Sequence, residues 1–308
     1  MVGFLPVLLA AIAYPQLKMD AAFVGDPPTY VGEEFYLRIA IYNPTMDEQE
    51  EVRFILPVYY LIFSALRGCD DAAFPMRILN KTSGKAVWCG ELGAGLWLGD
   101  SLKTRPPQDT IRLGKDDTLV FFVAIGYSIG GYMLSESGEY CIEEIAMQWH
   151  GDTLIKCTPE LKFNLKMLEP DVYADLESLY NSHDKRNIKE ETRSFIKSHS
   201  DHPIVKAYIE HYFSLVAVEG DYSAEKEVLV LYAEKFPAFF IFSGTYNSLV
   251  KKEPDLANQI RPILESGLEN HPFANDIWLV AQRAEENFPK FESFLEKSHE
   301  EIKKRTER

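Results

Sequence analysis

Hydrophobic and polar side chains alternate along short segments in the first half of the chain. In segment 34–43, every second residue from Phe35 to Ile41 is large and apolar. A period of two predicts a β-strand with one buried face. The sequence Asn-Pro-Thr at 43–45 ends this strand, because proline has no N–H to donate to a sheet. Further strands are predicted around 52–57, 119–125, 140–147 and 161–167.

After Pro170 the hydrophobic period changes from two towards about 3.6, the period of an α-helix. Apolar stripes with this period cover 205–216 and 288–302. Each stripe must be covered by a partner, so the second half is predicted to form packed helices. The chain of 308 residues also exceeds the usual size of a single core. We therefore expect two separately packed domains, all-β at 14–170 and all-α at 171–308.

The beginning of the chain is apolar and uncharged from Phe4 to Ala13. This run has the length of the hydrophobic region of a signal peptide and is too short to span a membrane as a helix. Small residues at Ala11 and Ala13 fit a signal-peptidase site, which predicts cleavage before Tyr14. We expect residues 1–13 to be a signal peptide and the mature protein to be secreted or periplasmic. A buried N-terminal strand and a membrane anchor are the alternatives.

The rest of the chain has no stretch that approaches the roughly 20 apolar residues of a membrane span. The mature protein is therefore expected to be soluble. Its formal net charge is −15, and both halves are acidic. Because binding to nucleic acid depends on clustered Lys and Arg side chains, nucleic acid is not an expected partner.

All four cysteines lie in the first half of the chain, and none forms a C-x-x-C pair, which disfavours a zinc site. In an exported protein the natural use of cysteines is in disulfides. Three pairings are possible, and we favour Cys69 with Cys89 and Cys141 with Cys157, because each pair brackets a plausible hairpin. Four free thiols are the alternative if the protein is not exported.

The segment 137–141, Ser-Gly-Glu-Tyr-Cys, resembles the tyrosine corner of immunoglobulin-like domains. In that motif a tyrosine hydroxyl at the start of a late strand hydrogen-bonds back to the main chain. Together with the predicted strands, it makes the first half resemble the immunoglobulin-like β-sandwich found in many exported bacterial proteins. The family has a cysteine two residues after the tyrosine, whereas Cys141 follows Tyr140 directly, which favours a bridge to Cys157. The resemblance implies a fold and a compartment, and no catalytic residue.

Three prolines in the second half, Pro203, Pro237 and Pro272, are separated by 34 and 35 residues. This spacing is the length of a tetratricopeptide (TPR) helix pair. Gly220 falls where that family turns between its two helices. The second half therefore resembles a TPR-like array of three to four helical hairpins.

Three residues depart from the TPR pattern. Phe213 and Glu225 stand where the family has small residues, and Pro262 falls inside a predicted helix, where it would remove a backbone hydrogen bond. A helical-hairpin array without TPR geometry is the alternative.

The combination of an immunoglobulin-like sandwich and a TPR-like array predicts a non-enzymatic exported module that binds a protein or peptide without a cofactor. If the TPR pattern holds, four residues of first helices face the concave side and bind this partner: Glu210, Ser214, Thr245 and Lys252. A carbohydrate-binding or adhesive sandwich is an alternative, and four aromatic residues could line its sugar-binding face. These are Tyr59, Tyr60, Trp88 and Trp97.

Motifs for catalysis and metal binding are weak. Segment 126–130 matches the G-x-S-x-G pattern of α/β-hydrolases, which would make Ser128 a nucleophile, but no helix is predicted after it. A hydrolase using Ser128, or a site between the domains, is the second alternative function. His199 and His202 have no third ligand and are predicted to lie in a solvated loop, so we expect no metal site. Asn80 begins a formal N-glycosylation sequon, which we expect to be silent.

Overall fold

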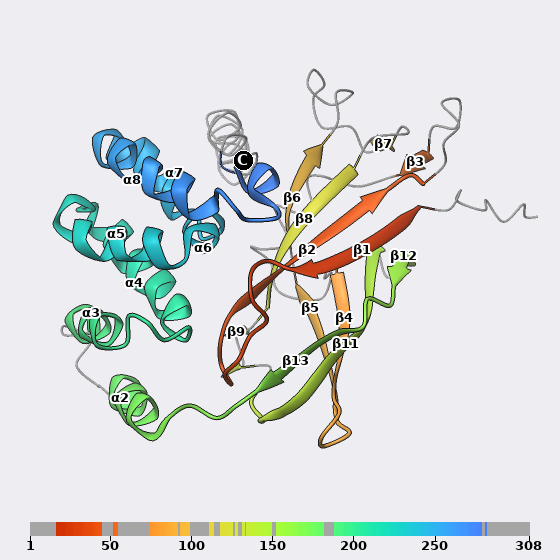
Figure 1. The fold of residues 1–308 in the computed structure, drawn as a ribbon, viewed down its shortest axis with the longest axis horizontal. Helices are drawn as coiled ribbons and strands as arrows, with labels where there is room; N and C mark the ends of the chain where they lie inside the picture. Colours follow the sequence, from red (N-terminus) through yellow and green to blue (C-terminus); the bar gives the residue numbers. More distant parts are fainter. Residues whose placement is uncertain are drawn as a thin grey trace, which may run out of the picture.

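The computed structural model describes residues 17–44, 52–54, 74–91, 93–98, 111–113, 118–125, 127–128, 131–132, 134–149, 152–181, 188–278 and 281. Strands fill the first half of the chain and helices the second (Figure 1). No described residue after Lys166 lies in a strand or bridge, and the first described helix begins at Pro170. The predicted order, strands and then helices, is confirmed.

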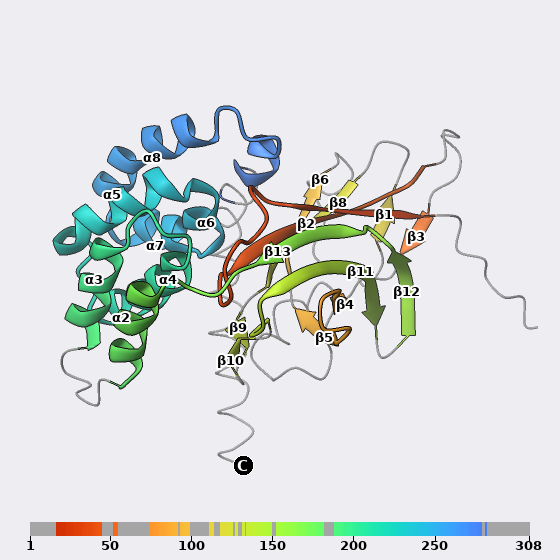
Figure 2. The same cartoon turned by 60° about the horizontal axis from the view of Figure 1, so that its bottom comes forward.

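The strands form two main sheets that face each other (Figure 2). The first sheet has the order β1-β2-β8-β6, and the second has the order β12-β11-β4-β5, with β13 also paired to β11. Small two-stranded sheets join β3 to β7 and β9 to β10. The bounds are β1 Lys18–Phe23, β2 Phe35–Tyr42, β3 Val52–Phe54, β4 Phe74–Asn80, β5 Ala86–Glu91, β6 Gly93–Leu98, β7 Ile111–Leu113, β8 Thr118–Ile125, β9 Tyr127–Ser128, β10 Gly131–Tyr132, β11 Gly138–Trp149, β12 Asp152–Cys157 and β13 Leu161–Leu165.

A shared hydrophobic core fills the space between the two main sheets. Leu37 of β2 and Phe121 of β8 pack there with Ile78 of β4 and Ile142 of β11, and all four are fully buried. The alternation that predicted the strand at 34–43 therefore identified the correct inward residues. Each of the five predicted strands overlaps a strand of the structure, although residues 55–57 of the second lie outside the described part.

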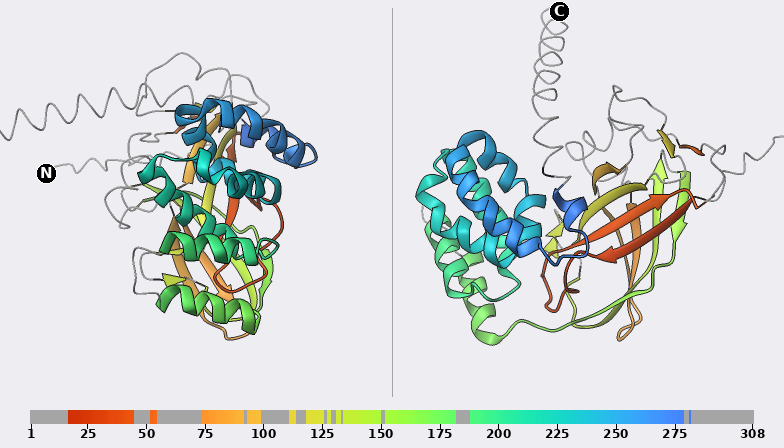
Figure 3. Two further views of the ribbon diagram at one scale, coloured as in Figure 1. Left: turned by 90° about the vertical axis from the view of Figure 1, so that its left-hand side faces the viewer. Right: turned by 45° about the horizontal axis from the view of Figure 1, so that its top comes forward.

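The helices pack against the outer face of the first sheet at β2 and β8, so these two strands are buried on both sides (Figure 3), whereas Lys18 and Asp20 on the same face of β1 are exposed. Tyr36 and Ala40 of β2 and Val120 and Phe122 of β8 belong to the same hydrophobic cluster as the helices. The prediction of only one buried face on β2 was therefore wrong. The cluster between the sheets and the cluster of the helices are separate, and the outward residues of β2 and β8 belong to the second. The second core extends from the helices onto the sheet.

The helical region is built from successive hairpins. Helix α2 packs on α3, α3 on α4, and α8 on both α5 and α7. Pro237 is the first residue of α6, and Pro203 and Pro272 each precede the start of a helix by two residues. The bounds are α2 Pro170–Asn181, α3 Ile188–Ser198, α4 Val205–Glu219, the 3-10 turn η4 Ser223–Glu225, α5 Lys226–Lys235, α6 Pro237–Phe242, α7 Thr245–Lys252 and α8 Pro254–Leu268.

The prolines mark a repeated turn between hairpins. The backbone N–H of Ile204 donates to Nδ1 of His202 at 3.2 Å, and the N–H of Phe273 donates to Nδ1 of His271 at 3.1 Å. The two histidines are 69 residues apart, twice the spacing of the prolines, and each directly precedes one of them. The proline spacing read from the sequence therefore corresponds to a structural repeat.

Two of the three residues that depart from the TPR pattern, Phe213 and Pro262, lie within helices that continue past them. Phe213 is buried and stacks on Tyr232, with ring centroids 6.0 Å apart. Helix α8 continues through Pro262 to Leu268, and Pro262 lies on its exposed side. The carbonyl that loses its N–H partner there can be hydrated, which is why the helix tolerates this proline.

Candidate functional site

The turns between hairpins lie along one stretch of the β-region, residues 30–38. We call the three segments 199–206, 236–242 and 271–276 the docking turns; the second of them consists of Phe236 and the short helix α6. Repeats of equal length place equivalent residues on the same edge of a helical array. This edge faces strand β2, so the docking turns and residues 30–38 form the interface between the two regions of the protein.

The first docking turn carries a buried ion pair. Nζ of Lys206 lies 2.7 Å from Oε1 of Glu33, and the two side chains are 8% and 4% exposed. The other carboxylate oxygen of Glu33 accepts the backbone N–H of Thr29 at 2.8 Å. Lys206 also lies over the ring of Phe239, 4.5 Å from its centroid. Both charges therefore have partners inside the protein, as buried charges require.

The second docking turn is aromatic. Tyr36 of β2 contacts the rings of Phe239 and Phe242, with centroids 4.7 and 4.9 Å away. Phe242 also stacks on Phe122 of β8 at 4.5 Å. Aromatic contacts of this kind bury large apolar areas and fix the relative position of the packed elements.

The third docking turn pairs with Arg38. Nε of Arg38 donates to Oδ2 of Asp276 at 2.7 Å, and its guanidinium lies 4.8 Å from the centroid of Phe273. Arg38 lies on the face of β2 that the sequence predicted to be exposed. In the structure its side chain is only 20% exposed, because Asp276 satisfies its charge.

Two histidines of the first docking turn are also paired. Nε2 of His202 lies 3.1 Å from Glu169, whose other oxygen accepts the hydroxyl of Tyr30 at 2.8 Å. Nε2 of His199 lies 2.8 Å from Asp175. Residues 199–204 form the predicted loop between α3 and α4, but the side chains of His199 and His202 are only 12% and 13% exposed, so both rings are less solvated than predicted.

Hydrogen bonding at this junction shifts two pKa values in opposite directions. The Tyr30 hydroxyl is the main cause that lowers the pKa of Glu169, and the hydrogen bond to Glu169 raises the pKa of Tyr30. Because Nδ1 of His202 accepts a backbone N–H, the neutral ring carries its proton on Nε2 and donates it to Glu169.

A second buried carboxylate lies inside the helical region. Glu225 is 4% exposed and pairs with Lys189 and Arg193 of α3, each at 3.4 Å. Burial, and next the neighbouring Glu225, raise the pKa of Tyr212 far above its ordinary value. The acidic residue that departs from the TPR pattern therefore lies beside two cations of α3.

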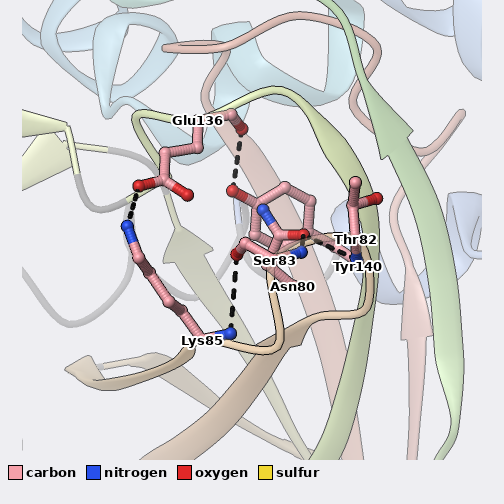
Figure 4. Close-up of polar contacts among 6 residues, drawn as sticks. All are labelled: Asn80, Thr82, Ser83, Lys85, Glu136 and Tyr140. Carbon is pink, nitrogen blue, oxygen red and sulfur yellow. Dashed lines mark hydrogen bonds and ion pairs between the residues drawn. The ribbon is translucent and has the colours of Figure 1, made fainter.

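The tyrosine corner predicted from segment 137–141 is present in the structure (Figure 4). The hydroxyl of Tyr140 donates to the backbone oxygen of Glu136 at 2.7 Å, and burial raises the pKa of Tyr140. Beside it, the Asn80 side chain accepts the backbone N–H groups of Thr82 and Ser83 at 2.9 and 3.0 Å. Asn80 is 2% exposed, so the sequon is not accessible in the folded protein.

The predicted Cys141–Cys157 disulfide is wrong, because both residues are free thiols. Strand pairing places Cys157 opposite Ile145, four residues from Cys141 along β11. That separation is about 13 Å, well beyond the reach of a disulfide. Cys69, and with it the predicted Cys69–Cys89 bridge, lies outside the described residues.

Cys157 is expected to react slowly with iodoacetamide in the folded protein. Burial, followed by the charge of Asp20, raises the pKa of Cys157 to about 11 from 9.0. Because the thiolate is the reacting species, this shift lowers its fraction at neutral pH about a hundredfold. Alkylation followed by mass spectrometry should modify Cys141 and Cys157 only after unfolding in urea. Rapid modification of Cys157 in the native protein would contradict the raised pKa of this half-buried thiol.

The four predicted binding residues do not form one exposed surface. Thr245 is 5% exposed and its hydroxyl pairs with Ser243 at 2.8 Å, so the prediction that it binds a partner was wrong. Lys252 is exposed, with Nζ 5.6 Å from the ring centroid of Tyr222. Glu210 and Ser214 belong to α4, but their side chains lie outside the described part of the structure.

Ser128 lies in a strand pair and not at a nucleophile elbow. It pairs with Gly131 of β10, whereas a hydrolase elbow leads from a strand into a helix. Tyr59 and Tyr60, proposed for sugar binding, lie outside the described residues, as do the side chains of Trp88 and Trp97. Within the described ranges there is no cluster of three His, Cys, Asp or Glu residues that could hold a metal ion. In the same ranges no helix has the length and apolar character needed to cross a membrane.

Comparison of the chain with protein-family models, with curated proteins and with solved structures finds no match. The function must therefore be inferred from the contacts between the helices and the sheets. These contacts identify an interface, formed by the three docking turns and residues 30–38, that joins the helices firmly to the sheets.

Proposed function

We propose that the chain is an exported, non-enzymatic module that binds a protein or peptide through the exposed faces of its helices. The observation that supports this most is the burial of the docking turns against the β-region. A buried ion pair, stacked aromatic rings and a second ion pair hold the helices in place. A surface that is already ordered loses less entropy when a partner binds, so the β-region serves as a rigid mount for the helical surface.

The proposal includes two folds, an immunoglobulin-like sandwich for the β-region and a TPR-like array for the helices. The tie from Tyr140 to the backbone of Glu136 supports an immunoglobulin-like sandwich. The repeated histidine–proline turns, and Gly220 with φ 78° at the end of α4, support a TPR-like array. Phe213 and the charged, buried Glu225 favour a divergent member of such an array over a regular one.

The proposed binding surface centres on Lys252, the described member of the predicted set that is exposed. It lies in the last turn of α7 beside Lys251, which is also exposed. Both belong to the second half of the array, away from the docking turns. A partner that binds here contacts helices without disturbing the interface with the sheets.

Site-specific photo-crosslinking can test this surface. A photoreactive amino acid at Lys252 in the full-length protein should crosslink one defined partner in an extract of the source cells. The matched control is the same probe at Lys162, which is exposed on β13. Identical crosslinks from both positions, or none from Lys252, would reject the helical surface as the binding site.

Export is supported by the apolar segment 4–13 and no longer by a disulfide between Cys141 and Cys157. Mass spectrometry of the protein from its source tests export separately. A mature protein that begins at Tyr14 is expected, and one that retains Met1 would overturn this part of the proposal.

A further inference from the structure

The third docking turn contains His271, whose ring is held in a way that suits the neutral form and not the doubly protonated form. Nδ1 of His271 accepts the backbone N–H of Phe273 at 3.1 Å. Nε2 of the same ring is buried and has no hydrogen-bond partner among the described residues. Burial of the ring lowers the pKa of His271. The neutral imidazole therefore fits this turn, and the charged form does not.

Protonation of His271 would remove the hydrogen bond at Nδ1 and would place a charge in a buried site. An imidazolium donates from both nitrogens, so Nδ1 could no longer accept the N–H of Phe273. Nε2 already carries the proton of the neutral ring and has no acceptor among the described residues, so the added charge would be buried without a partner, which is unfavourable. The ring must leave its position to regain water, and the turn must open with it.

The equivalent turn, 69 residues earlier, provides an internal comparison. His202 has the same Nδ1 contact, to the N–H of Ile204 at 3.2 Å. Its Nε2, however, faces the carboxylate of Glu169 at 3.1 Å. A charged His202 therefore keeps an ion pair, whereas a charged His271 has none.

The charged groups around the third turn do not compensate for this difference. Among the described residues these groups are Glu269 just before the turn, Asp276 in the turn, Arg38 on β2, and Arg261 on α8, whose guanidinium lies over Trp278. Glu269 is exposed, and Asp276 is already paired with Arg38. Burial is the cause of the lowered pKa of His271, with no contribution from a neighbouring charge.

We propose that segment 268–276 is an acid-sensitive latch, in which proton uptake by His271 releases Phe273 and Asp276 from Arg38. The first docking turn stays in place under the same conditions, because Lys206 and Glu33 are buried together and His202 has Glu169 beside it. Acid thus loosens one end of the interface between helices and sheets, and leaves the other end closed.

The direction of the effect follows from linkage. The closed turn has a histidine pKa below the ordinary value of 6.5, so the open turn binds the proton more tightly. Opening is therefore favoured as the pH falls below about 6.5, by up to about tenfold for each pH unit. Above that range the latch is closed and insensitive to pH.

Hydrogen exchange of the full-length protein at about pH 7.5 and about pH 5.5 tests the proposal, after correction for the intrinsic effect of pH on exchange. Amides of 273–278 should lose protection at the lower pH by about tenfold. Amides of 204–209, in the equivalent turn, should change by less than about threefold. Equal changes in the two turns, or no change in either, would overturn the proposal.

Two matched variants locate the titrating group. His271→Asn offers a side-chain oxygen to the N–H of Phe273 but does not titrate, so it should abolish the acid response of 273–278. His202→Asn should leave that response unchanged. An acid response that persists in His271→Asn would show that another group is responsible. If His271→Asn does not fold, the comparison of the two turns in the unaltered protein still decides the question.

Discussion

Replacing Lys206 with methionine is expected to lower the free energy of unfolding by about 3–5 kcal/mol. The substitution leaves Glu33 charged and buried, since its side chain is only 4% exposed. Its remaining partners are the backbone N–H groups of Thr29 and Tyr30, at 2.8 and 3.3 Å. Because the pair joins the first docking turn to the β-region, the loss should lower the midpoint of a single urea transition shared by both regions.

A double-mutant cycle separates the ion pair from simple loss of packing. Glu33→Gln and Lys206→Met should each be destabilising, and the double variant should cost clearly less than their sum, because it leaves no unpaired buried charge. The control is Lys197→Met, which breaks an exposed pair with Glu227 of 2.6 Å and should cost less than about 1 kcal/mol. If Lys206→Met costs no more than this control, the buried pair does not stabilise the interface.

The sequence predicted the inward face of strand β2 correctly but not its outward face. Tyr36 and Ala40 are compatible with either a solvated or a buried face, and Arg38 between them favoured solvent. In the structure the charge of Arg38 is satisfied by Asp276, which lies 238 residues later in the chain. A single strand carries no information about a partner so distant, so the burial of the outer face of β2 against the helices could not be predicted from alternation.

The docking turns could have been found from a simple signal. The dipeptide His-Pro occurs at 202–203 and again at 271–272, and its spacing is twice that of the prolines already noted. A prediction that considers His199 and His202 only as possible metal ligands does not compare His202 with His271. Equivalent histidines in a repeat predict equivalent turns, and the two Nδ1 contacts confirm that the turns are equivalent.

The disulfide prediction failed because it depended on strand register. The β11–β12 hairpin closes between Trp149 and Asp152, which places Cys157 opposite Ile145 and not opposite Cys141. A shift of register at Met147/Gln148 adds to the difference. Bracketing a hairpin is therefore insufficient to predict a disulfide, since the exact pairing decides which residues meet.

Gly138→Ala is expected to be strongly destabilising, by about 3–5 kcal/mol. Gly138 has φ 140°, a conformation that residues with a side chain rarely adopt. A Cβ here would also lie 2.8 Å from Oγ1 of Thr82 and 3.0 Å from Oδ1 of Asn80. These two oxygens accept backbone N–H groups that hold the β4–β5 turn and the start of β11, from Thr82 and Ser83 and from Glu139.

Because Tyr140 is two residues further along β11, displacement of this turn should also disturb its bond to Glu136. Gly25→Ala is the matched control, with φ 83° and no atom within 4 Å of the added Cβ. It carries backbone strain without the close contacts and should cost about 1–2 kcal/mol. Urea unfolding of both variants measures the difference. Equal costs would mean that the close approach of Gly138 to Thr82 and Asn80 does not contribute to stability, and that backbone strain alone selects glycine at this position.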